Sequence, residues 1–383
     1  MLKNKFFLGL IVLLFSIHTK ATVSVDPLSK INSKSYILVD QETGQVLKSL
    51  KSVEQLAPAS LTKVMTAYVV FDKLKNGNLK LEDETIVSKK AWKTGGSKTF
   101  IEVGKKVKIE DLIKGMIVQS GNDAATALAE HISGTEENFA IEMNDYAKKI
   151  GMENSNFLNV SGLPTEGHYS TAEDLSILAR RMILDFPEYY PYYSIKSFTY
   201  NNISQNTRNR LLFSDKEVDG MKTGYTDKAG YCYISSAVRN GKRLVTVVLG
   251  ADKPQKRFDD AKTLFNYGFN NFDTHRVIVK NKVIEQLNTN VLKGDKNLVR
   301  VGASEDIIFV SERNKEENID VEVNMRDIVI APISKGDVLG VMVIKRNEEI
   351  IAEVDVIALE GIKTGDFFKV LKDSLQLYLE KFN

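Results

Sequence analysis

The order in which hydrophobic patterns follow one another is the feature that most limits what this chain can fold into. A strand pattern in SYILVDQETGQVLKS comes first, helical patterns follow, and YCYISSAVRNGKRLVTVVLG returns to strands around the hairpin signal Asn240-Gly241. Apolar residues recur at spacings of three and four in the helical segments, which predict helices over 60–75, 110–118, 122–132, 136–150 and 171–184. Strands that flank a block of helices predict an α+β domain, which we place at residues 22–275.

A different pattern begins near Arg276. The segments VIVKNKVIEQLNTNVLKG, EDIIFVSE and DVLGVMVIKRNEEIIAEVDVIAL alternate apolar and polar residues, and turn residues separate them at regular spacing. Short strands of this kind are typical of an all-β domain, which we expect over residues 276–362.

Residues 363–383 predict a third unit, an amphipathic helix that anchors the protein. Charged residues fill one side, and the other side carries Phe367, Phe368, Leu371, Leu375, Tyr378 and Phe382 at spacings of three and four. Because charges interrupt the apolar stripe all along, we expect the helix to lie in the membrane surface and not to cross the bilayer. Two glycines in LEGIKTGDFF predict a hinge that frees this helix, and packing on the β-rich domain is the alternative.

The N-terminus reads MLKNKFFLGLIVLLFSIHTKA, in which two lysines precede an apolar run. This order predicts a secretory signal peptide over residues 1–21, so that the mature protein works outside the cytoplasm. An uncleaved membrane anchor is the alternative, but the apolar run is short for a bilayer span.

Composition narrows the range of functions. The chain has 52 Lys and Arg against 50 Asp and Glu, which argues against a nucleic-acid partner, because such proteins present a basic face. The only cysteine is Cys232, which excludes an intrachain disulfide and a cysteine-based zinc cluster. We expect neither a metal nor a cofactor.

The stretch LAPASLTKVMTAYVV places Ser60 and Lys63 at the head of a predicted helix, and this is the only Ser-x-x-Lys in the sequence. The spacing puts both side chains on one helix face. A serine becomes a good nucleophile when a base takes its proton, and lysine is a base only when burial or a second positive charge lowers its pKa. The N–H groups at the helix start would face a developing oxyanion. The alternative is an ordinary helix cap followed by a solvated lysine.

Two further motifs carry polar side chains with catalytic chemistry. Ser120 and Asn122, in IVQSGNDAATALAE, lie in a polar break between helices, where a hydroxyl relays a proton and an amide holds a carbonyl. The alternative is a helix–helix turn capped by Asn122. Lys-Thr-Gly occurs at 93–95, 222–224 and 363–365, of which only the second opens the predicted hairpin. An extended peptide can pair with such an edge strand, and Lys222 and Thr223 would bind its terminal carboxylate.

Ser-x-x-Lys, Ser-x-Asn and Lys-Thr-Gly in this order form the motif set of penicillin-binding proteins and class A β-lactamases. With QSGNDAATALAEHISG, RNRLLFSDKEVDGMKTGYTDKAGY and APISKGDVLGVMVIK, the chain resembles the low-molecular-mass penicillin-binding proteins, the D-alanyl-D-alanine carboxypeptidases of the type 5/6 group. The resemblance covers nearly the whole chain. It implies helices packed on an antiparallel sheet, a substrate of peptidoglycan stem peptides ending in D-Ala-D-Ala, covalent inhibition by β-lactams, and work at the periplasmic face of the cytoplasmic membrane.

The resemblance also implies roles for single residues. Ser60 would be the acylated nucleophile, Lys63 its base, and Ser120 a member of the proton relay. The substrate would contact Asn122, Lys222, Thr223, Gly224, Tyr225 and Arg257, with the N–H groups of Ser60 and Tyr225 as the oxyanion hole. His168 would lie in a loop over the site, and an exposed loop histidine is the alternative. Tyr225 departs from relatives, which often have a smaller residue or histidine after Lys-Thr-Gly.

Three other functions stay open. A β-lactamase shares the motifs, but EGHYS at Glu166 lacks the Glu-x-x-Leu-Asn pattern of class A enzymes, and the β-rich domain argues against it. A D,D-endopeptidase cuts a related bond. A non-catalytic module that binds cell-wall peptide is a further alternative, which is disfavoured because all three catalytic motifs are intact. A Ser-His-Asp hydrolase is disfavoured because no Gly-x-Ser-x-Gly elbow is present.

Overall fold

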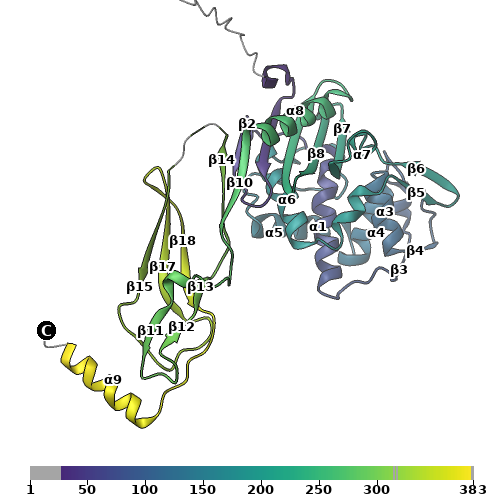
Figure 1. The fold of residues 1–383 in the computed structure, drawn as a ribbon. Coiled ribbons are helices and arrows are strands. Elements are labelled where there is room, and N and C mark those ends of the chain that lie inside the picture. Colours follow the sequence, from purple (N-terminus) through teal and green to yellow (C-terminus); the bar gives the residue numbers. More distant parts are fainter. Residues whose placement is uncertain (1–26, 314, 316–317, 381–383) are drawn as a thin grey trace, which may run out of the picture.

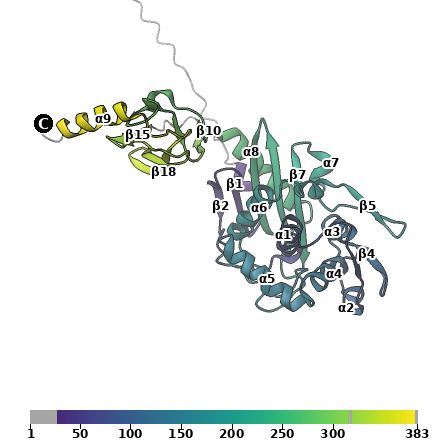
Figure 2. The ribbon, with the colours of Figure 1, turned by 90° about the horizontal axis from the view of Figure 1, so that it is seen from below.

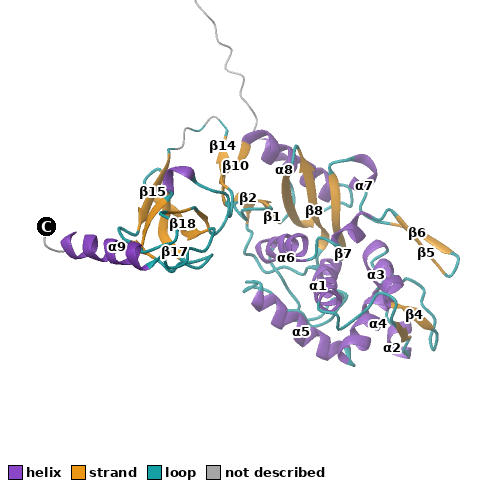
Figure 3. Cartoon of the chain, turned by 60° about the horizontal axis from the view of Figure 1, so that its bottom comes forward, coloured by secondary structure: helices purple, strands orange, loops and turns teal. Residues whose placement is uncertain are grey.

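The computed structural model describes residues 27–313, 315 and 318–380, and the predicted signal peptide lies outside these residues. Two units follow one another along the chain (Figure 1): a broad N-terminal unit, residues 27–271, and a narrower β-rich unit, residues 272–362. Helix α9 comes last and points away from both (Figure 2). Most helices belong to the N-terminal unit, as Figure 3 shows.

The N-terminal unit is built on one antiparallel sheet with the strand order β2-β1-β9-β8-β7. The strands predicted at the beginning and at the end of this unit in the sequence are therefore neighbours in the sheet. Ile37 of β1, for example, pairs with Val247 of β9. Strand β7 lies at an edge, as expected for the strand that carries Lys222. The strands span Ser35–Asp40 (β1), Val46–Leu50 (β2), Val218–Thr226 (β7), Gly230–Arg239 (β8) and Lys242–Ala251 (β9).

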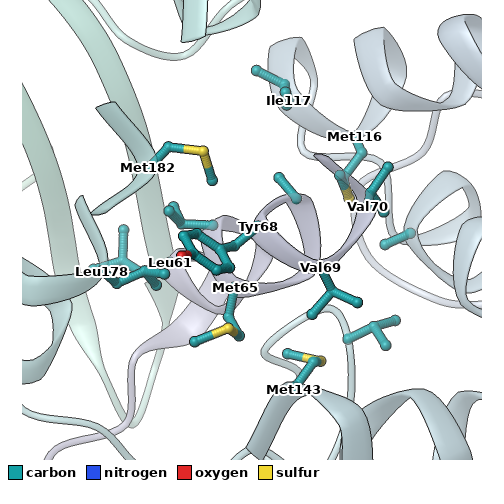
Figure 4. Close-up of a cluster of buried hydrophobic side chains, with 14 of the residues drawn as sticks. Leu61, Met65, Tyr68, Val69, Val70, Met116, Ile117, Met143, Leu178 and Met182 are labelled. Carbon is teal, nitrogen blue, oxygen red and sulfur yellow. The ribbon is translucent and has the colours of Figure 1, made fainter. Parts of the chain in front are cut away.

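Helices cover both faces of this sheet. Because side chains alternate across a strand, Leu38 packs with α8 on one face, while Ile37 packs with α1 and α6 on the other. Figure 4 shows part of the second core, where Met65 and Tyr68 of α1 lie among side chains of α3, α5 and α6. These helices span Thr62–Lys75 (α1), Ile109–Val118 (α3), Glu136–Lys149 (α5), Ala172–Asp185 (α6) and Lys256–Asn271 (α8).

The predicted α+β class and all the predicted helices are confirmed, with small shifts at their ends. The shift that matters is at residue 60, because Ala59–Leu61 form a 3-10 turn and α1 begins only at Thr62. The remaining helices are Lys89–Lys93 (α2), Asn122–Ser133 (α4) and Leu211–Ser214 (α7). Two small two-stranded sheets were not predicted: Glu84–Ile86 (β3) pairs with Lys106–Lys108 (β4) across α2, and Ser197–Tyr200 (β5) forms a hairpin with Ile203–Asn206 (β6).

The β-rich unit forms its own core from three small sheets. Strand β10 crosses the boundary expected at residue 275: Phe272 packs in the α8 core, whereas Ile278 packs in the core of the β-rich unit. β10 pairs with β14, and the other sheets have the orders β12-β11-β16 and β13-β18-β17-β15. The strands are Phe272–Ile278 (β10), Thr289–Leu292 (β11), Leu298–Val299 (β12), Val301–Ala303 (β13), Ile307–Glu312 (β14), Ile319–Met325 (β15), Val329–Ile330 (β16), Val338–Arg346 (β17) and Glu349–Ala358 (β18).

Salt bridges join the two units next to β10. Arg276 pairs with Glu42, in the turn between β1 and β2, and its Nη1 lies 2.8 Å from Asp306 Oδ2 in the β-rich unit. Thr274 Oγ1 also donates a hydrogen bond to Asp40 at 3.0 Å. One turn of the N-terminal unit is thus fixed to the first strand of the next unit.

Helix α9, Phe367–Glu380, is fixed to the β-rich unit, so the hinge expected in LEGIKTGDFF is wrong. Thr364 forms a β-bridge with Gly294, and Gly365 N–H donates to the Lys293 carbonyl at 2.8 Å. Asp373, only 2% exposed, accepts a hydrogen bond from Lys293 N–H at 2.6 Å and pairs with Lys369. Hydrogen bonds to the backbone of Lys293 and Gly294 therefore hold the segment in which the glycines predicted a hinge.

The apolar stripe of α9 does not pack on the β-rich unit. Its side chains are 54–78% exposed, namely Phe367, Phe368, Leu371, Leu375, Tyr378 and Leu379. The helix contacts the unit instead through the side that carries Asp373. Within the described residues, no helix combines the length and the apolar character needed to cross a membrane.

Candidate active site

Ser60 and Lys63 meet at the start of α1. Lys63 Nζ lies 3.1 Å from Ser60 Oγ and donates a second hydrogen bond to the Ser161 carbonyl at 2.7 Å. The turn before α1 is tightly built: Ala59 has a positive φ of 49°, and Gly162 packs against the Ala59 carbonyl so closely that a Cβ there would come within 1.8 Å of it. The serine therefore has a fixed place beside a buried amine.

Burial sets the charge state of this amine. Desolvation and then the positive charge of Arg208 lower the pKa of Lys63 to about 7, against a smaller opposite effect of Asp123. The pKa of Lys222 is lowered well below its usual value by burial and then by the charges of Lys63, Arg208 and Arg257. Two buried amines that repel each other do not both hold a proton easily, so one of them is available as a base near neutral pH.

Ser120 and Asn122 lie at the turn between α3 and α4, next to Asp123, whose charge acts on Lys63. Ser120 has a φ of 65°, and the Ser120 Oγ and Asn122 Oδ1 atoms are buried without a hydrogen-bond partner among the described residues. Asn122 Nδ2 donates to the Gly95 carbonyl at 2.6 Å, which closes the loop after α2 over this turn. Buried polar atoms without partners are uncommon and are often found where a ligand completes the bonding.

The Lys-Thr-Gly copy at 222–224 lies beside Ser60. Gly224 faces the start of α1, and a Cβ at Gly224 would lie 3.1 Å from Ser60 N. Lys222 and Thr223 are 3% and 6% exposed, so both side chains are buried at this edge of the sheet. The copy at 93–95 ends α2, and its Gly95 carbonyl accepts the hydrogen bond from Asn122; the copy at 363–365 lies in the connection to α9.

Arg257 and Tyr225 lie on the other side of β7. Arg257 is 8% exposed, and its Nη1 donates to the Gly224 carbonyl at 3.0 Å. Burial lowers the pKa of Arg257, but a guanidinium stays charged at neutral pH. Tyr225 is 49% exposed and stacks on Tyr231.

His168 is a buried connector and not an exposed loop residue. Its Nδ1 accepts a hydrogen bond from Leu158 N–H at 3.1 Å, so the ring proton is on Nε2, which lies 2.9 Å from Thr62 Oγ1. Burial lowers the pKa of His168 to about 4, so the ring is neutral at physiological pH. The histidine ties the loop before α6 to the first residue of α1.

Arg208 is a residue near the site that the motifs did not indicate. It lies between β6 and α7, is exposed, and forms no ion pair within the described part of the chain. Its charge acts on both Lys63 and Lys222. The segment RNRLLF, which begins with Arg208, belongs to the family resemblance of the sequence, and no motif spacing indicates this arginine.

Comparison with known proteins identifies the family of the site. A model of the D-alanyl-D-alanine carboxypeptidase family matches residues 19–253, and a model of the penicillin-binding protein 5 C-terminal domain matches residues 272–364. The chain belongs to the D-alanyl-D-alanine carboxypeptidase family. Among curated members of that family, DacC of Escherichia coli strain K12 is 40% identical over 346 residues, which are 88% of this chain and 86% of the relative.

Solved structures of carboxypeptidases and penicillin-binding proteins have the same fold. Penicillin-binding protein 5 from Haemophilus influenzae is 37% identical with a TM-score of 0.77, and the alignment covers 87% of this chain and 98% of that one. Penicillin-binding protein D2 from Listeria monocytogenes, solved in the ampicillin-bound form, is 32% identical with a TM-score of 0.58 over 63% of this chain and 98% of its own. The family resemblance of the sequence is thus confirmed in both units.

Proposed function

We propose that this protein is a serine-type D-alanyl-D-alanine carboxypeptidase that removes the terminal D-alanine from peptidoglycan stem peptides through an acyl-enzyme on Ser60. The observation that carries the proposal is the pair of Ser60 Oγ and Lys63 Nζ, 3.1 Å apart, with a lysine pKa of about 7. A pKa near the working pH lets one amine take and return a proton.

The first half of the reaction is acylation. Neutral Lys63 takes the hydroxyl proton of Ser60, and the Oγ attacks the carbonyl carbon between the two D-alanines. The N–H groups of Ser60 and Tyr225 stabilise the oxyanion. The C–N bond breaks while the proton on Lys63 passes through the hydroxyl of Ser120 to the leaving amine, so free D-alanine departs and Lys63 is neutral again. Water then hydrolyses the ester and regenerates Ser60.

The second part of the proposal concerns substrate binding. Lys222, Thr223 and Arg257 give the edge of β7 the charge and hydroxyl needed for a terminal carboxylate, while Gly224 lets the strand approach the serine. Asn122 binds the backbone of the stem peptide. Its Oδ1 is one of the buried atoms that have no partner in the free protein, within the described residues.

Two partners belong to the same proposal. β-Lactams carry a carboxylate and a strained amide, and they acylate Ser60 as covalent inhibitors; the ampicillin-bound relative supports this. The exposed stripe of α9 supports peripheral attachment to the membrane after export, with the catalytic unit on the periplasmic face. We place the signal peptide at residues 1–21, the peptidase domain at 22–275, the β-rich domain at 276–362 and the anchor at 363–383.

Intact-mass analysis tests the function. The protein is incubated with ampicillin, and separately with a diacyl peptide ending in D-Ala-D-Ala whose products are identified. We expect one ampicillin adduct on Ser60 and release of D-alanine, both lost in Ser60→Ala and kept in the control Ser204→Ala, an exposed serine of β6. An adduct on another residue refutes the assignment. Cleavage of crosslinked dimers in preference to D-Ala-D-Ala ends shows an endopeptidase, and rapid ampicillin turnover shows a β-lactamase.

A further inference from the structure

Tyr225 and Tyr231 form an aromatic pair on the neighbouring strands β7 and β8. Their ring centroids are 4.4 Å apart with an interplanar angle of 25°, and the Tyr225 hydroxyl donates to Asp227 at 2.7 Å. Tyr225 is 49% exposed, yet its ring is fixed by stacking along its face and by the hydrogen bond at its tip. The Tyr225 ring is thus held rigidly on its stacked face and at its hydroxyl, while its other face is open to solvent or to a ligand.

The pair lies on the same side of β7 as Thr223 and as Arg257 of α8, two of the three residues proposed to bind the carboxylate. Thr223 pairs with Tyr233, which packs on Phe258 of α8, and Tyr225 pairs with Tyr231 two residues along. Side chains two apart on a strand share a face, so Thr223 and Tyr225 both project to the α8 side, opposite to Gly224. A carboxylate bound at Thr223 would therefore lie on the same strand face as the ring of Tyr225.

Arg257 connects the carboxylate site to the pair. Its Cζ lies 5.5 Å from the Tyr231 ring and 4.8 Å from the Phe258 ring, so two aromatic faces hold the guanidinium. Nη1 is used by the Gly224 carbonyl, and the buried Nε has no partner among the described residues. A guanidinium that two rings hold in one orientation can donate hydrogen bonds to a carboxylate without rearranging.

From this arrangement we propose that the ring of Tyr225 walls the subsite for the C-terminal residue of the substrate and selects leaving residues with small side chains. The inference rests on the proposed function. When the carboxylate binds Thr223 and Arg257, and the carbonyl binds the N–H of Tyr225, the α-carbon of the leaving residue lies between these groups. Its side chain then meets the Tyr225 ring. A methyl group or a hydrogen fits, whereas a long chain, such as the leaving residue of a peptide crosslink, does not.

The test compares leaving residues in the full-length protein. Diacyl peptides ending in D-Ala-D-Ala, D-Ala-Gly and D-Ala-D-Leu are hydrolysed by the wild type and by Tyr225→Ala, Tyr225→Phe and Tyr225→Trp. We expect Tyr225→Ala to raise the kcat/KM for D-Leu relative to D-Ala by roughly tenfold, since steric selection in a pocket has about this size. Tyr225→Phe should keep the wild-type ratio, and Tyr225→Trp should lower it.

Ampicillin acylation of each variant reports whether the site has folded. If Tyr225→Ala does not acylate, Tyr225→Trp still decides, because a larger ring must make the selection stricter. Equal losses for all three peptides, or a ratio unchanged within twofold in both Tyr225→Ala and Tyr225→Trp, would overturn the inference. These outcomes differ from failure of the proposed function, in which the wild type itself releases no D-alanine.

Discussion

Lys63 Nζ is held between Ser60 Oγ at 3.1 Å and the Ser161 carbonyl at 2.7 Å, inside a site where Lys63 is only 1% exposed. The carbonyl takes one N–H of the amine and fixes its direction. The neutral amine can then turn its lone pair toward the hydroxyl. This relationship gives the pH dependence of the first chemical step.

The rate of Ser60 acylation should rise with pH through about 7, because the pKa of Lys63 is lowered to that value and only the neutral amine accepts a proton. Below this pH the rate should fall roughly tenfold per unit. Lys63→Arg should reduce acylation on the order of 10³-fold, since arginine does not lose its proton in this range. Stopped-flow measurements with a chromogenic β-lactam from pH 5.5 to 8.5 check both statements, and a flat profile contradicts them.

Arg208→Ala should move the midpoint of that profile to higher pH. The charge of Arg208 lowers the pKa of Lys63, so its removal lets the amine keep its proton longer. Arg210→Ala is the matched control, because Arg210 lies two residues away and faces Gln255. An equal shift of the midpoint in both variants would show that only the net charge of the protein matters. An unchanged midpoint in Arg208→Ala would show that Arg208 does not affect the pKa of Lys63.

Gly162→Ala should destabilise the N-terminal unit strongly. The position has a φ of 78°, and the new Cβ would lie 1.8 Å from the Ala59 carbonyl. Gly77→Ala is the control, because its φ is 74° but no atom lies within 4 Å of the new Cβ. We expect a loss of about 1–2 kcal/mol in the free energy of unfolding for the control and on the order of 4 kcal/mol for Gly162→Ala. Chemical denaturation measures both, and similar losses would show that the contact with Ala59 does not matter.

Asp373→Asn should loosen α9 from the β-rich unit without weakening its apolar stripe. The Lys293 N–H and then Lys369 lower the pKa of Asp373, so the ionised carboxylate that holds the contact is favoured at neutral pH and lost as the pH falls through that lowered pKa. Hydrogen exchange at Lys293 should become faster in the variant. Leu375→Ala is the counterpart: it should reduce binding to lipid vesicles and leave the exchange at Lys293 unchanged. Slow exchange in Asp373→Asn would show that this contact is not what orders the helix.

Local patterns in the sequence predicted the helices and the motif geometry well, because those features depend on residues that are close to one another in the sequence. The Ser60–Lys63 contact follows from a spacing of three, and the edge position of Lys222 follows from the hairpin after it. The role of His168 as a connector to Thr62 joins residues 106 positions apart, which no local pattern contains. Arg208 was missed for the same reason, since its influence on the lysines acts through space.

The connection to α9 shows where propensity misleads. Two glycines suggested freedom, yet Gly365 and its neighbours are tied by backbone hydrogen bonds to Lys293 and Gly294. Glycine is used there because the strands approach closely: a Cβ at Gly365 would lie 2.7 Å from the Gly294 carbonyl. A glycine that allows two backbone segments to approach closely cannot be distinguished, in a sequence, from a glycine in a flexible hinge.

Asp373 attaches α9 to one part of the β-rich unit, and the Arg276 salt bridges to Glu42 and Asp306 attach the N-terminal unit to another part. The β-rich unit is therefore a rigid connection between α9 and the catalytic unit. If the apolar stripe of α9 attaches the protein to a membrane, as proposed, this rigid connection would hold Ser60 at one height above the lipid. The enzyme would then trim only those stem peptides that hang within a thin layer of the cell wall. Peptides nearer to the lipid or farther from it would keep their terminal D-alanine, so the length of the β-rich unit would set where in the wall they remain intact.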